Sequence, residues 1–202
     1  GLFSIPSSLF LNIPIINSQI VDSIGINWQN PKHFITTRIN FFFSKAIISN
    51  SESGRVAYRQ KKNNVVKINN GIFFERFQVK KNNKKIEIKY KKCFKYLVVM
   101  VGTFSIYKDF NFFIDIAKAF SLIREDTGFI AIGSGENFDY ISNKIKVENT
   151  KNVILTGKQD NVEEILSICD IGVLFSPYGE GISNAILEYM ASGLPVLATN
   201  KG

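Results

Sequence analysis

The sequence contains very few of the residues that bind transition metals or build hydrolytic triads. Among its 202 residues there are one histidine and two cysteines, Cys93 and Cys169. Neither a zinc site with cysteine and histidine ligands nor a Ser-His-Asp triad is therefore expected. The two distant cysteines leave a disulfide open as an alternative, and a reduced cytoplasmic setting is the simpler interpretation.

Several short motifs of nucleotide and hydrolase chemistry are also absent. The chain has no G-x-x-x-x-G-K-[ST] phosphate loop, no G-x-S-x-G turn and no Asp-x-Asp pair that would carry a divalent metal onto a nucleotide diphosphate. Gly133-Ser134-Gly135 begins like a dinucleotide loop, but position 138 is Phe where that motif needs a third glycine. Close packing of a strand against a helix is the simpler explanation of these glycines.

Positive charge is plentiful, with a formal net charge of +8, and it is concentrated in one segment. Residues 80–95 contain eight lysines, namely Lys80, Lys81, Lys84, Lys85, Lys89, Lys91, Lys92 and Lys95. Such a cluster attracts anionic membrane surfaces or nucleic acid. No nucleic-acid recognition pattern accompanies it, so we expect no nucleic-acid partner. A solvated linker and a membrane contact remain the two interpretations.

The beginning of the chain does not indicate a membrane span. Residues 2–16 are apolar, but Pro6, Asn12 and Pro14 interrupt them and no basic leader precedes them. The chain starts at Gly1 and stops directly after an apparent strand, so we expect an internal fragment of a longer protein.

Before residue 78 the pattern of apolar and turn residues predicts a mixed α/β arrangement. The expected elements are a strand at 13–16, a loop at 17–33, a helix at 34–46, a strand at 46–48, a helix from the capping residues 49–54 to about 60, and a strand at 64–68. The lysine-rich residues that follow mark a domain boundary.

After residue 95 strands and helices alternate regularly. Strands are expected at 96–101, 129–132, 153–156, 171–175 and 195–198, and helices at 110–124, 138–147, 162–169 and 183–191. Continuous apolar strands joined by helices indicate a parallel sheet covered on both faces. Ligands bind such sheets at the carboxyl ends of the strands, where Gly102, Gly133, Gly157 and the loop 176–183 fall.

The most informative stretch is residues 179–188. A helix begins near Ile182 to Ser183, and its N-terminus offers backbone N–H groups to an anion. Glu180 precedes the helix and Glu188 lies about two turns into it, so both cannot contact one anion. The arrangement suits a phosphate flanked by hydroxyl-rich groups, as in a nucleotide sugar. Lys108, six residues past Gly102, is within reach of such phosphates, although a surface lysine is the simpler interpretation of this residue taken alone.

These residues resemble a known family. The run from Glu180 to Val196 is similar to the E-x7-E signature of the retaining group 1 glycosyltransferases of GT-B fold. Residues 101–109 resemble that family's first loop in the donor domain, and 132–135, 156–158 and 169–171 fall at its spacings. Residues 48–54 and 70–72 resemble the end of its acceptor domain.

The resemblance implies an α/β GT-B architecture of two Rossmann-like parallel-sheet domains, the first truncated at its N-terminus and the second at its C-terminus. Residues 1–78 would end the acceptor domain, 79–95 would be a lysine-rich linker, and 96–202 would form an incomplete donor-binding domain. Such a fragment is expected to be inactive alone.

The resemblance also implies roles for individual residues. Glu180 would face the donor sugar, Glu188 would bind the ribose hydroxyls, and Lys108 would neutralise the leaving diphosphate. The remaining donor-site residues would be Gly102, Thr103, Gly133, Gly157, Lys158, Gly181, Ile182, Ser183 and Asn184, with Gly157 and Lys158 near the base. The family generally needs no metal, and no cofactor is expected beside the nucleotide diphosphate sugar.

Two positions depart from the family pattern. Thr103 stands where an arginine is common, so that Lys108 carries more of the positive charge. No histidine occurs near residues 17–19, where the family often has one beside the donor sugar.

The predicted function is transfer of a sugar, with retention, to a glycan or lipid-linked acceptor. The predicted setting is cytoplasmic, peripheral at the inner membrane face through residues 80–95. Two alternatives remain, namely a nucleotide-sugar epimerase or phosphorylase of the same fold and a non-catalytic nucleotide-binding module.

Overall fold

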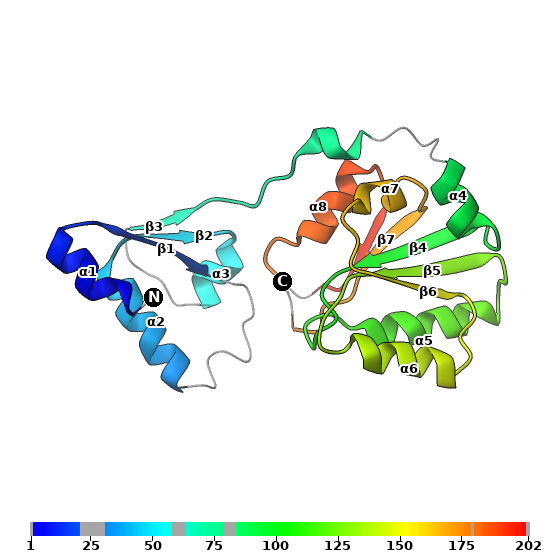
Figure 1. The fold of residues 1–202 in the computed structure, drawn as a ribbon, viewed down its shortest axis with the longest axis horizontal. Helices are drawn as coiled ribbons and strands as arrows, with labels where there is room; N and C mark the ends of the chain where they lie inside the picture. Colours follow the sequence, from blue (N-terminus) through cyan, green and yellow to red (C-terminus); the bar gives the residue numbers. More distant parts are fainter. Residues whose placement is uncertain (1, 21–30, 58–63, 79–83, 179, 201–202) are drawn as a thin grey trace. The chain divides into compact units, whose positions relative to one another are not determined.

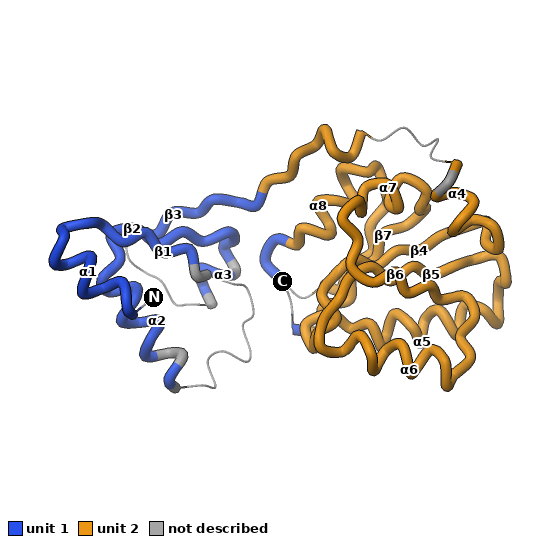
Figure 2. The backbone as a smooth tube through the Cα atoms, viewed as in Figure 1, with its two compact units in different colours: residues 1–70, 178–182, 201–202 blue, residues 71–177, 183–200 orange. Residues whose placement is uncertain are grey.

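The computed structural model describes residues 2–20, 31–57, 64–78, 84–178 and 180–200 (Figure 1). The backbone divides into two compact units (Figure 2). Unit 1 comprises residues 1–70, 178–182 and 201–202, and unit 2 comprises residues 71–177 and 183–200. The domain limits at 78 and 95 stay predictions from the sequence.

Unit 1 contains a parallel sheet of three strands in the order β1-β2-β3. The strands are β1 (Ile15–Ile20), β2 (Ser44–Ser49) and β3 (Val65–Lys67), and the helices are α1 (Ser4–Leu11), α2 (Pro31–Phe43) and α3 (Glu52–Ala57). Because α2 connects β1 to β2 and α3 connects β2 to β3, the strands run parallel as two βαβ units.

Several sequence expectations for unit 1 are wrong at their limits. The loop expected at 17–33 is shorter, because β1 continues to Ile20 and α2 begins at Pro31; residues 21–30 lie outside the described part. Pairing with β2 makes residues 17–20 a strand despite their polar sequence. Proline suits the first helical position, where its missing N–H costs nothing. The helix ends at Phe43 rather than residue 46, because Ser44 already starts β2.

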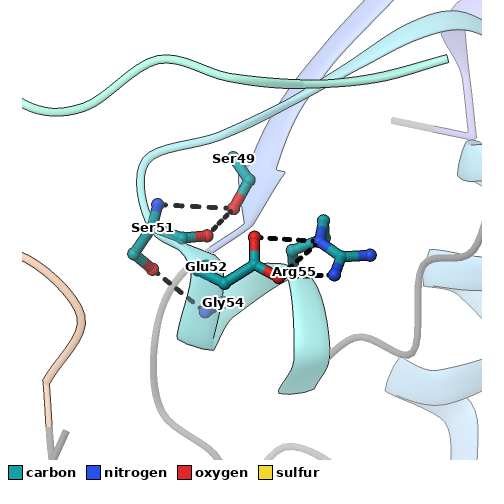
Figure 3. A network of polar contacts seen from close by, with 5 residues as sticks. All are labelled: Ser49, Ser51, Glu52, Gly54 and Arg55. Atoms are coloured by element: carbon teal, nitrogen blue, oxygen red, sulfur yellow. Dashed lines mark hydrogen bonds and ion pairs between the residues drawn. The ribbon is translucent and has the colours of Figure 1, made fainter. Parts of the chain in front are cut away.

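The start of α3 follows the capping residues predicted from the sequence (Figure 3). The Ser51 hydroxyl accepts a hydrogen bond from the Gly54 N–H at 3.0 Å, which is the interaction of an N-cap serine. Glu52 and Arg55 form an ion pair on the exposed side of this helix. The expected end near residue 60 falls outside the described residues, which show α3 as far as Ala57.

Unit 2 is a five-stranded parallel sheet in the order β6-β5-β4-β7-β8. Its strands are β4 (Tyr96–Val101), β5 (Thr127–Ile132), β6 (Val153–Gly157), β7 (Ile171–Leu174) and β8 (Val196–Ala198). Four helices connect them: α5 (Phe110–Ser121), α6 (Phe138–Val147), α7 (Val162–Leu166) and α8 (Asn184–Ala191). The alternation predicted after residue 95 is confirmed.

Helices cover both faces of this sheet (Figure 1). On one face Leu97 and Val99 of β4 pack in a core with α7 and α8, and on the other Met100 packs with α5 and α6. Successive strand residues point to opposite faces, so apolar residues at every position fill both cores. This explains why the strands read as continuous apolar runs.

Two elements of unit 2 before β4 cover the first of these faces. The 3-10 helix η2 (Phe74–Phe77) and helix α4 (Lys84–Lys91) contribute Phe77, Ile86 and Tyr90 to the core with α7 and α8. Helix α4 lies in the segment predicted to be a linker. Its two core residues, Ile86 and Tyr90, are four positions apart, which places both on one side of the helix, whereas Ile88, Lys84 and Lys89 are exposed.

Helix α1 was also not predicted as a helix.

Among the described helices, none combines the length and the hydrophobicity that a transmembrane span requires. Cys93 and Cys169 are free thiols, the first exposed and the second buried.

Candidate nucleotide-binding edge

The loops after β4, β5, β6 and β7 meet at the carboxyl edge of the unit 2 sheet. Gly102 follows β4 and donates its N–H to the Ile132 carbonyl at 3.0 Å, and Gly133 follows β5 and donates to the Gly157 carbonyl at 3.0 Å. The structure thus brings together three glycines that the sequence predicts at this edge. Lys158, exposed, follows Gly157 directly.

Gly133 is the point of closest approach between two of these loops. A Cβ atom at this position would lie 1.9 Å from the Gly102 carbonyl oxygen, and its φ is +144°. A side chain would therefore clash with backbone in a conformation that only glycine adopts readily. The contact is between two loops at the edge, rather than the strand-to-helix packing expected from the sequence.

The edge contains a topological switch point between β4 and β7. From β4 the chain continues through β5 and β6 on one side, whereas β7 and β8 lie on the other. Connections that leave in opposite directions open a crevice at the carboxyl ends of such strands, and ligands of open α/β sheets bind there. The loop 102–109, which follows β4 at the switch point, carries the predicted site residues Gly102, Thr103 and Lys108.

Lys108 lies at this switch point. Its aliphatic part covers Gly102, where an added Cβ would be 3.3 Å from Lys108 Cγ, and its Nζ donates to Ser176 Oγ at 3.4 Å. Burial lowers the pKa of the Lys108 amine to about 8, from an ordinary value of 10.5. A partly desolvated ammonium group interacts strongly with an anion, because little water screens its charge.

Backbone hydrogen bonds hold the Lys108 loop against β7. The Asp109 N–H donates to the Phe175 carbonyl at 2.8 Å, and the Asp109 carboxylate accepts from the Phe112 N–H at 2.9 Å and so caps α5. Thr103 is exposed beside Gly102. The loop is thus tied at its end both to a strand of the sheet and to the helix that follows.

Ser176 is held from the other side by Thr199. The Ser176 N–H donates to the Thr199 hydroxyl at 3.0 Å, and this hydroxyl donates to the Ser176 carbonyl at 3.3 Å. Ser176 is almost completely buried. Sequence reasoning placed position 176 in the loop but did not single out Ser176, Thr199 or Asp109. The available signals were the small polar side chains of Thr199 and Ser176 soon after β8 and β7, and an aspartate directly before α5.

Helix α8 carries the second predicted acid. Ser183 stands at its N-cap with extended backbone, Asn184 is its first residue, and Glu188 is half-buried one turn later. Burial is the main reason that the pKa of Glu188 lies above its ordinary value; Arg76 opposes this shift and Glu163 adds to it. The Glu188 carboxylate makes no hydrogen bond or ion pair with another described residue, so its oxygens can accept hydrogen bonds from a ligand.

Arg76 and Glu163 form an ion pair beside this acid. Their side chains, from η2 and α7, approach to 2.9 Å. Because Glu163 takes up much of the charge of Arg76, Glu188 remains a desolvated acid near a cation that is already paired. Neither Arg76 nor Glu163 was predicted as part of the site.

Residues 178–182 group with unit 1. Glu180, Gly181 and Ile182 are half-buried, and the Ile182 carbonyl accepts a hydrogen bond from the Asn70 amide at 3.3 Å. Glu180 and Glu188 therefore belong to different units of the backbone. The seven residues between them include the point at which the chain passes from one unit to the other.

In the part of the chain that the structure describes, no three histidine, cysteine or acidic side chains form a group suited to a metal ion. The two predicted charged groups in unit 2 with shifted pKa values are instead Lys108, at the switch point, and Glu188, on α8. This set suits a ligand that presents both an anion and hydroxyl groups.

A parallel sheet with helices on both faces defines an α/β protein, and the comparisons extend this class to a family. The sequence profile of the family "Glycosyl transferases group 1" matches residues 95–202. The chain belongs to this family.

Two curated relatives agree with this assignment. The chain is 34% identical over 91 residues to N-acetyl-alpha-D-glucosaminyl L-malate synthase of Bacillus anthracis, which is 44% of this chain and 24% of the relative. It is 29% identical over 139 residues to UDP-Gal:alpha-D-GlcNAc-diphosphoundecaprenol alpha-1,3-galactosyltransferase of Escherichia coli, which is 66% of this chain and 36% of the relative. The matches thus span about a quarter and a third of these proteins.

Solved structures establish the GT-B fold. HepE from Anabaena, crystallised with UDP and glucose, superimposes with a TM-score of 0.85 at 18% identity, over 100% of this chain and 57% of HepE. The α/β architecture with parallel sheets predicted from the sequence is confirmed.

Proposed function

We propose that this protein is a retaining glycosyltransferase that takes its sugar from a nucleotide diphosphate sugar. The observation that carries the proposal is the half-buried Lys108 amine at the switch point, 3.4 Å from Ser176 Oγ, in a chain of the group 1 family. A cation placed there meets the negative charge that develops on a departing diphosphate. Such electrostatic stabilisation is usually the largest contribution to catalysis of this kind.

The other predicted residues take complementary roles in this proposal. The half-buried Glu188 accepts hydrogen bonds from the ribose hydroxyls, while backbone groups of residues 181–184 contact the sugar and the diphosphate. Glu180 faces the donor sugar. Gly157 and Lys158, at the end of β6, lie beside the base.

The retaining reaction follows as a same-face displacement. The acceptor hydroxyl attacks the anomeric carbon on the face from which the diphosphate leaves, so the bond to the phosphate oxygen breaks as the new glycosidic bond forms. The acceptor proton passes to a donor phosphate oxygen. Lys108 stabilises the leaving group, and no enzymic nucleophile is required.

We infer uridine as the base of the donor. The printed name of the Escherichia coli relative specifies UDP-Gal, and HepE was crystallised with UDP. The test is a calorimetric titration of the chain with UDP-, GDP- and ADP-sugars. Binding of UDP-sugars at least about tenfold tighter than the others supports the inference. Equal affinity for all three overturns the choice of base, and absence of binding overturns the donor site.

Retention requires a separate test with the protein in its native length. We expect the product of an α-linked donor to be α-linked in its NMR spectrum, and turnover to fall at least about a hundredfold in Glu180→Ala. A β-linked product contradicts retention. Activity of Glu180→Ala within a few-fold of the unmodified protein contradicts the role of Glu180.

We also propose a lipid-linked acceptor at an anionic membrane surface. The relative from Escherichia coli acts, by its name, on a diphosphoundecaprenol-linked sugar. Exposed Lys89, Lys92 and Lys95 on and after α4 supply cationic groups, each worth about 1 kcal/mol near an anionic surface.

Liposome sedimentation tests the membrane proposal. Replacing Lys89, Lys92 and Lys95 together by glutamine should abolish preference for anionic over neutral lipid. The matched control replaces Lys118, Lys146 and Lys151, which are exposed elsewhere in unit 2. If both triple variants lose the preference for anionic lipid to the same extent, the net charge of the chain, rather than the lysines on and after α4, causes that preference.

A further inference from the structure

Tyr189 of α8 inserts its hydroxyl between β4 and β7. The side chain is completely buried, its oxygen accepts a hydrogen bond from the Val101 N–H at 2.6 Å, and its hydroxyl donates to the Val173 carbonyl at 3.2 Å. The ring lies directly on Gly172, where an added Cβ would be 2.4 Å from the ring. One phenol thus joins backbone groups of two neighbouring strands.

The pairing of the strands explains why this hydroxyl is needed. β4 pairs with β5 along its whole length, from Tyr96 to Val101, whereas its pairs with β7 are Val98 with Ile171 and Val99 with Gly172. Beyond Val99 the Tyr189 hydroxyl takes the place of a direct bond between the strands. Their carboxyl ends are thereby held apart at the switch point.

Each strand end that Tyr189 holds leads into the candidate site. Val101 is followed by Gly102, on which the Lys108 stem lies, and Val173 leads to Ser176, the hydrogen-bond partner of Lys108. Glu188 is the residue before Tyr189 on α8. The phenol is therefore bonded to both borders of the crevice and covalently next to the predicted ribose ligand.

We propose that Tyr189 is a positioning residue for the nucleotide diphosphate, whose hydroxyl sets the separation of β4 and β7 and with it the placement of Lys108 and Glu188. This rests on the proposed function. Phenylalanine would fill the same space but would leave a buried N–H and a buried carbonyl without a partner. The Val101 N–H and the Val173 carbonyl would then either stay without a hydrogen-bond partner or bond to each other directly. A direct bond would bring the ends of β4 and β7 together and narrow the crevice.

Tyr90 offers a matched control in the same core. It is buried in α4, and its hydroxyl makes no hydrogen bond with another described residue. Tyr90→Phe removes the same kind of atom from another tyrosine of this core without touching either strand end.

The first experiment is a calorimetric titration of the 202-residue chain with UDP. Tyr189→Phe, which removes both hydrogen bonds of the phenol, should weaken binding about tenfold, and Tyr90→Phe less than about twofold. Thermal unfolding is recorded for both variants. If folded Tyr189→Phe binds UDP as tightly as the unmodified chain, the proposal is overturned, even if its unfolding temperature is lower.

A pH profile separates positioning from mere support of the core. Burial lowers the pKa of Lys108 to about 8, so binding should weaken above that pH. If the Lys108 loop shifts in Tyr189→Phe, water reaches the amine and the pKa rises toward its ordinary value. The alkaline limb of the profile should move upward in Tyr189→Phe and stay in place in Tyr90→Phe. An unmoved limb in both contradicts the proposal.

Amide hydrogen exchange tests the inference without depending on ligand binding. If the unmodified chain binds no UDP, the proposed donor fails, yet exchange in segments 100–108 and 173–178 still reports on Tyr189. Faster exchange confined to these segments in Tyr189→Phe supports the role, and uniform or absent acceleration overturns it. If that variant does not fold, the Val101 amide of the unmodified chain decides: rapid exchange there contradicts the hydrogen bond to Tyr189.

Discussion

Units 1 and 2 use the same parallel βαβ pattern, yet they bury their apolar side chains very differently. In unit 2 the side chains of Phe104 and Phe113 are completely buried and two cores fill both faces of the sheet. In unit 1, Phe3 and Phe10 are 98% and 90% exposed. Burial of an aromatic side chain stabilises a fold by about 1.5–3 kcal/mol, so unit 2 has much more of this stabilisation.

The comparison shows why the candidate site belongs on unit 2. A lysine keeps a depressed pKa only where its surroundings prevent water from reaching it. Around Lys108 that support comes from Gly102, Ser176 and the hydrogen bond from Asp109 to Phe175. A binding group on a well-packed scaffold loses little freedom when the ligand arrives.

The largest effect should come from a core substitution in unit 2. Phe113→Ala is expected to lower the free energy of unfolding by about 3–5 kcal/mol, because it leaves a cavity under the sheet. Phe10→Ala removes an exposed ring and should change it by no more than about 0.5 kcal/mol. Urea denaturation measures both. Equal losses would mean that the two units do not differ in packing as described.

The next effect tests the tight contact of two loops in unit 2. Gly133→Ala should cost at least about 2 kcal/mol, because a Cβ meets the Gly102 carbonyl and φ is positive. Gly71→Ala is the control, since nothing lies within 4 Å of its added Cβ. Thermal unfolding distinguishes them, and a well-tolerated alanine at 133 would show that the loops can separate freely.

The parallel sheet of unit 2 could be predicted from the sequence, because its apolar runs and strand-end glycines are local signals. Helix α4 could not be predicted in the same way. The eight lysines of residues 80–95 indicated a linker, although Ile86 and Tyr90 have helical spacing. In β1, pairing with β2 outweighed the polar residues 17–19.

The roles of the site residues stay predictions, and only their positions in the fold can be compared with the sequence. Residues at strand ends and a helix start, such as Lys108 and Glu188, can be found from local pattern. The contacts of Ser176 with Lys108 and of Tyr189 with Val101 join residues 68 and 88 positions apart. Such contacts depend on how helices and strands pack, which no local pattern encodes.

A smaller effect concerns the pH dependence of ligand binding. The pKa of Lys108 is about 8 in the fold, so the amine is charged at pH 7 and largely neutral at pH 9.5. UDP affinity should therefore fall about tenfold or more between these values, while it stays flat in Lys108→Met. The free energy of unfolding changes in the opposite direction. It should increase as pH rises from 8 toward 10.5, because in this range Lys108 is more often protonated in the unfolded chain than in the folded one. Parallel titrations and denaturation curves check both directions.

The smallest effect should come from Glu188. Burial raises its pKa in the fold, so ionisation at neutral pH disfavours the folded state, although solvent screening keeps this cost small. Glu188→Gln should slightly raise the unfolding temperature at pH 7, with the gain vanishing below the ordinary pKa of 4.5. The same variant should weaken UDP binding. Lower stability together with unchanged affinity would contradict a ligand-binding role.

The most direct test of the central claim is the dissociation constant of UDP for Lys108→Met, measured at pH 7 beside the unmodified chain. Methionine keeps most of the side-chain volume and removes the charge at the switch point. Lys118→Met, which removes an exposed lysine paired with Glu148, is the control. We predict binding at least about tenfold weaker for Lys108→Met and unchanged for Lys118→Met. Equal affinity of the two variants would contradict the assignment of this edge as the diphosphate site.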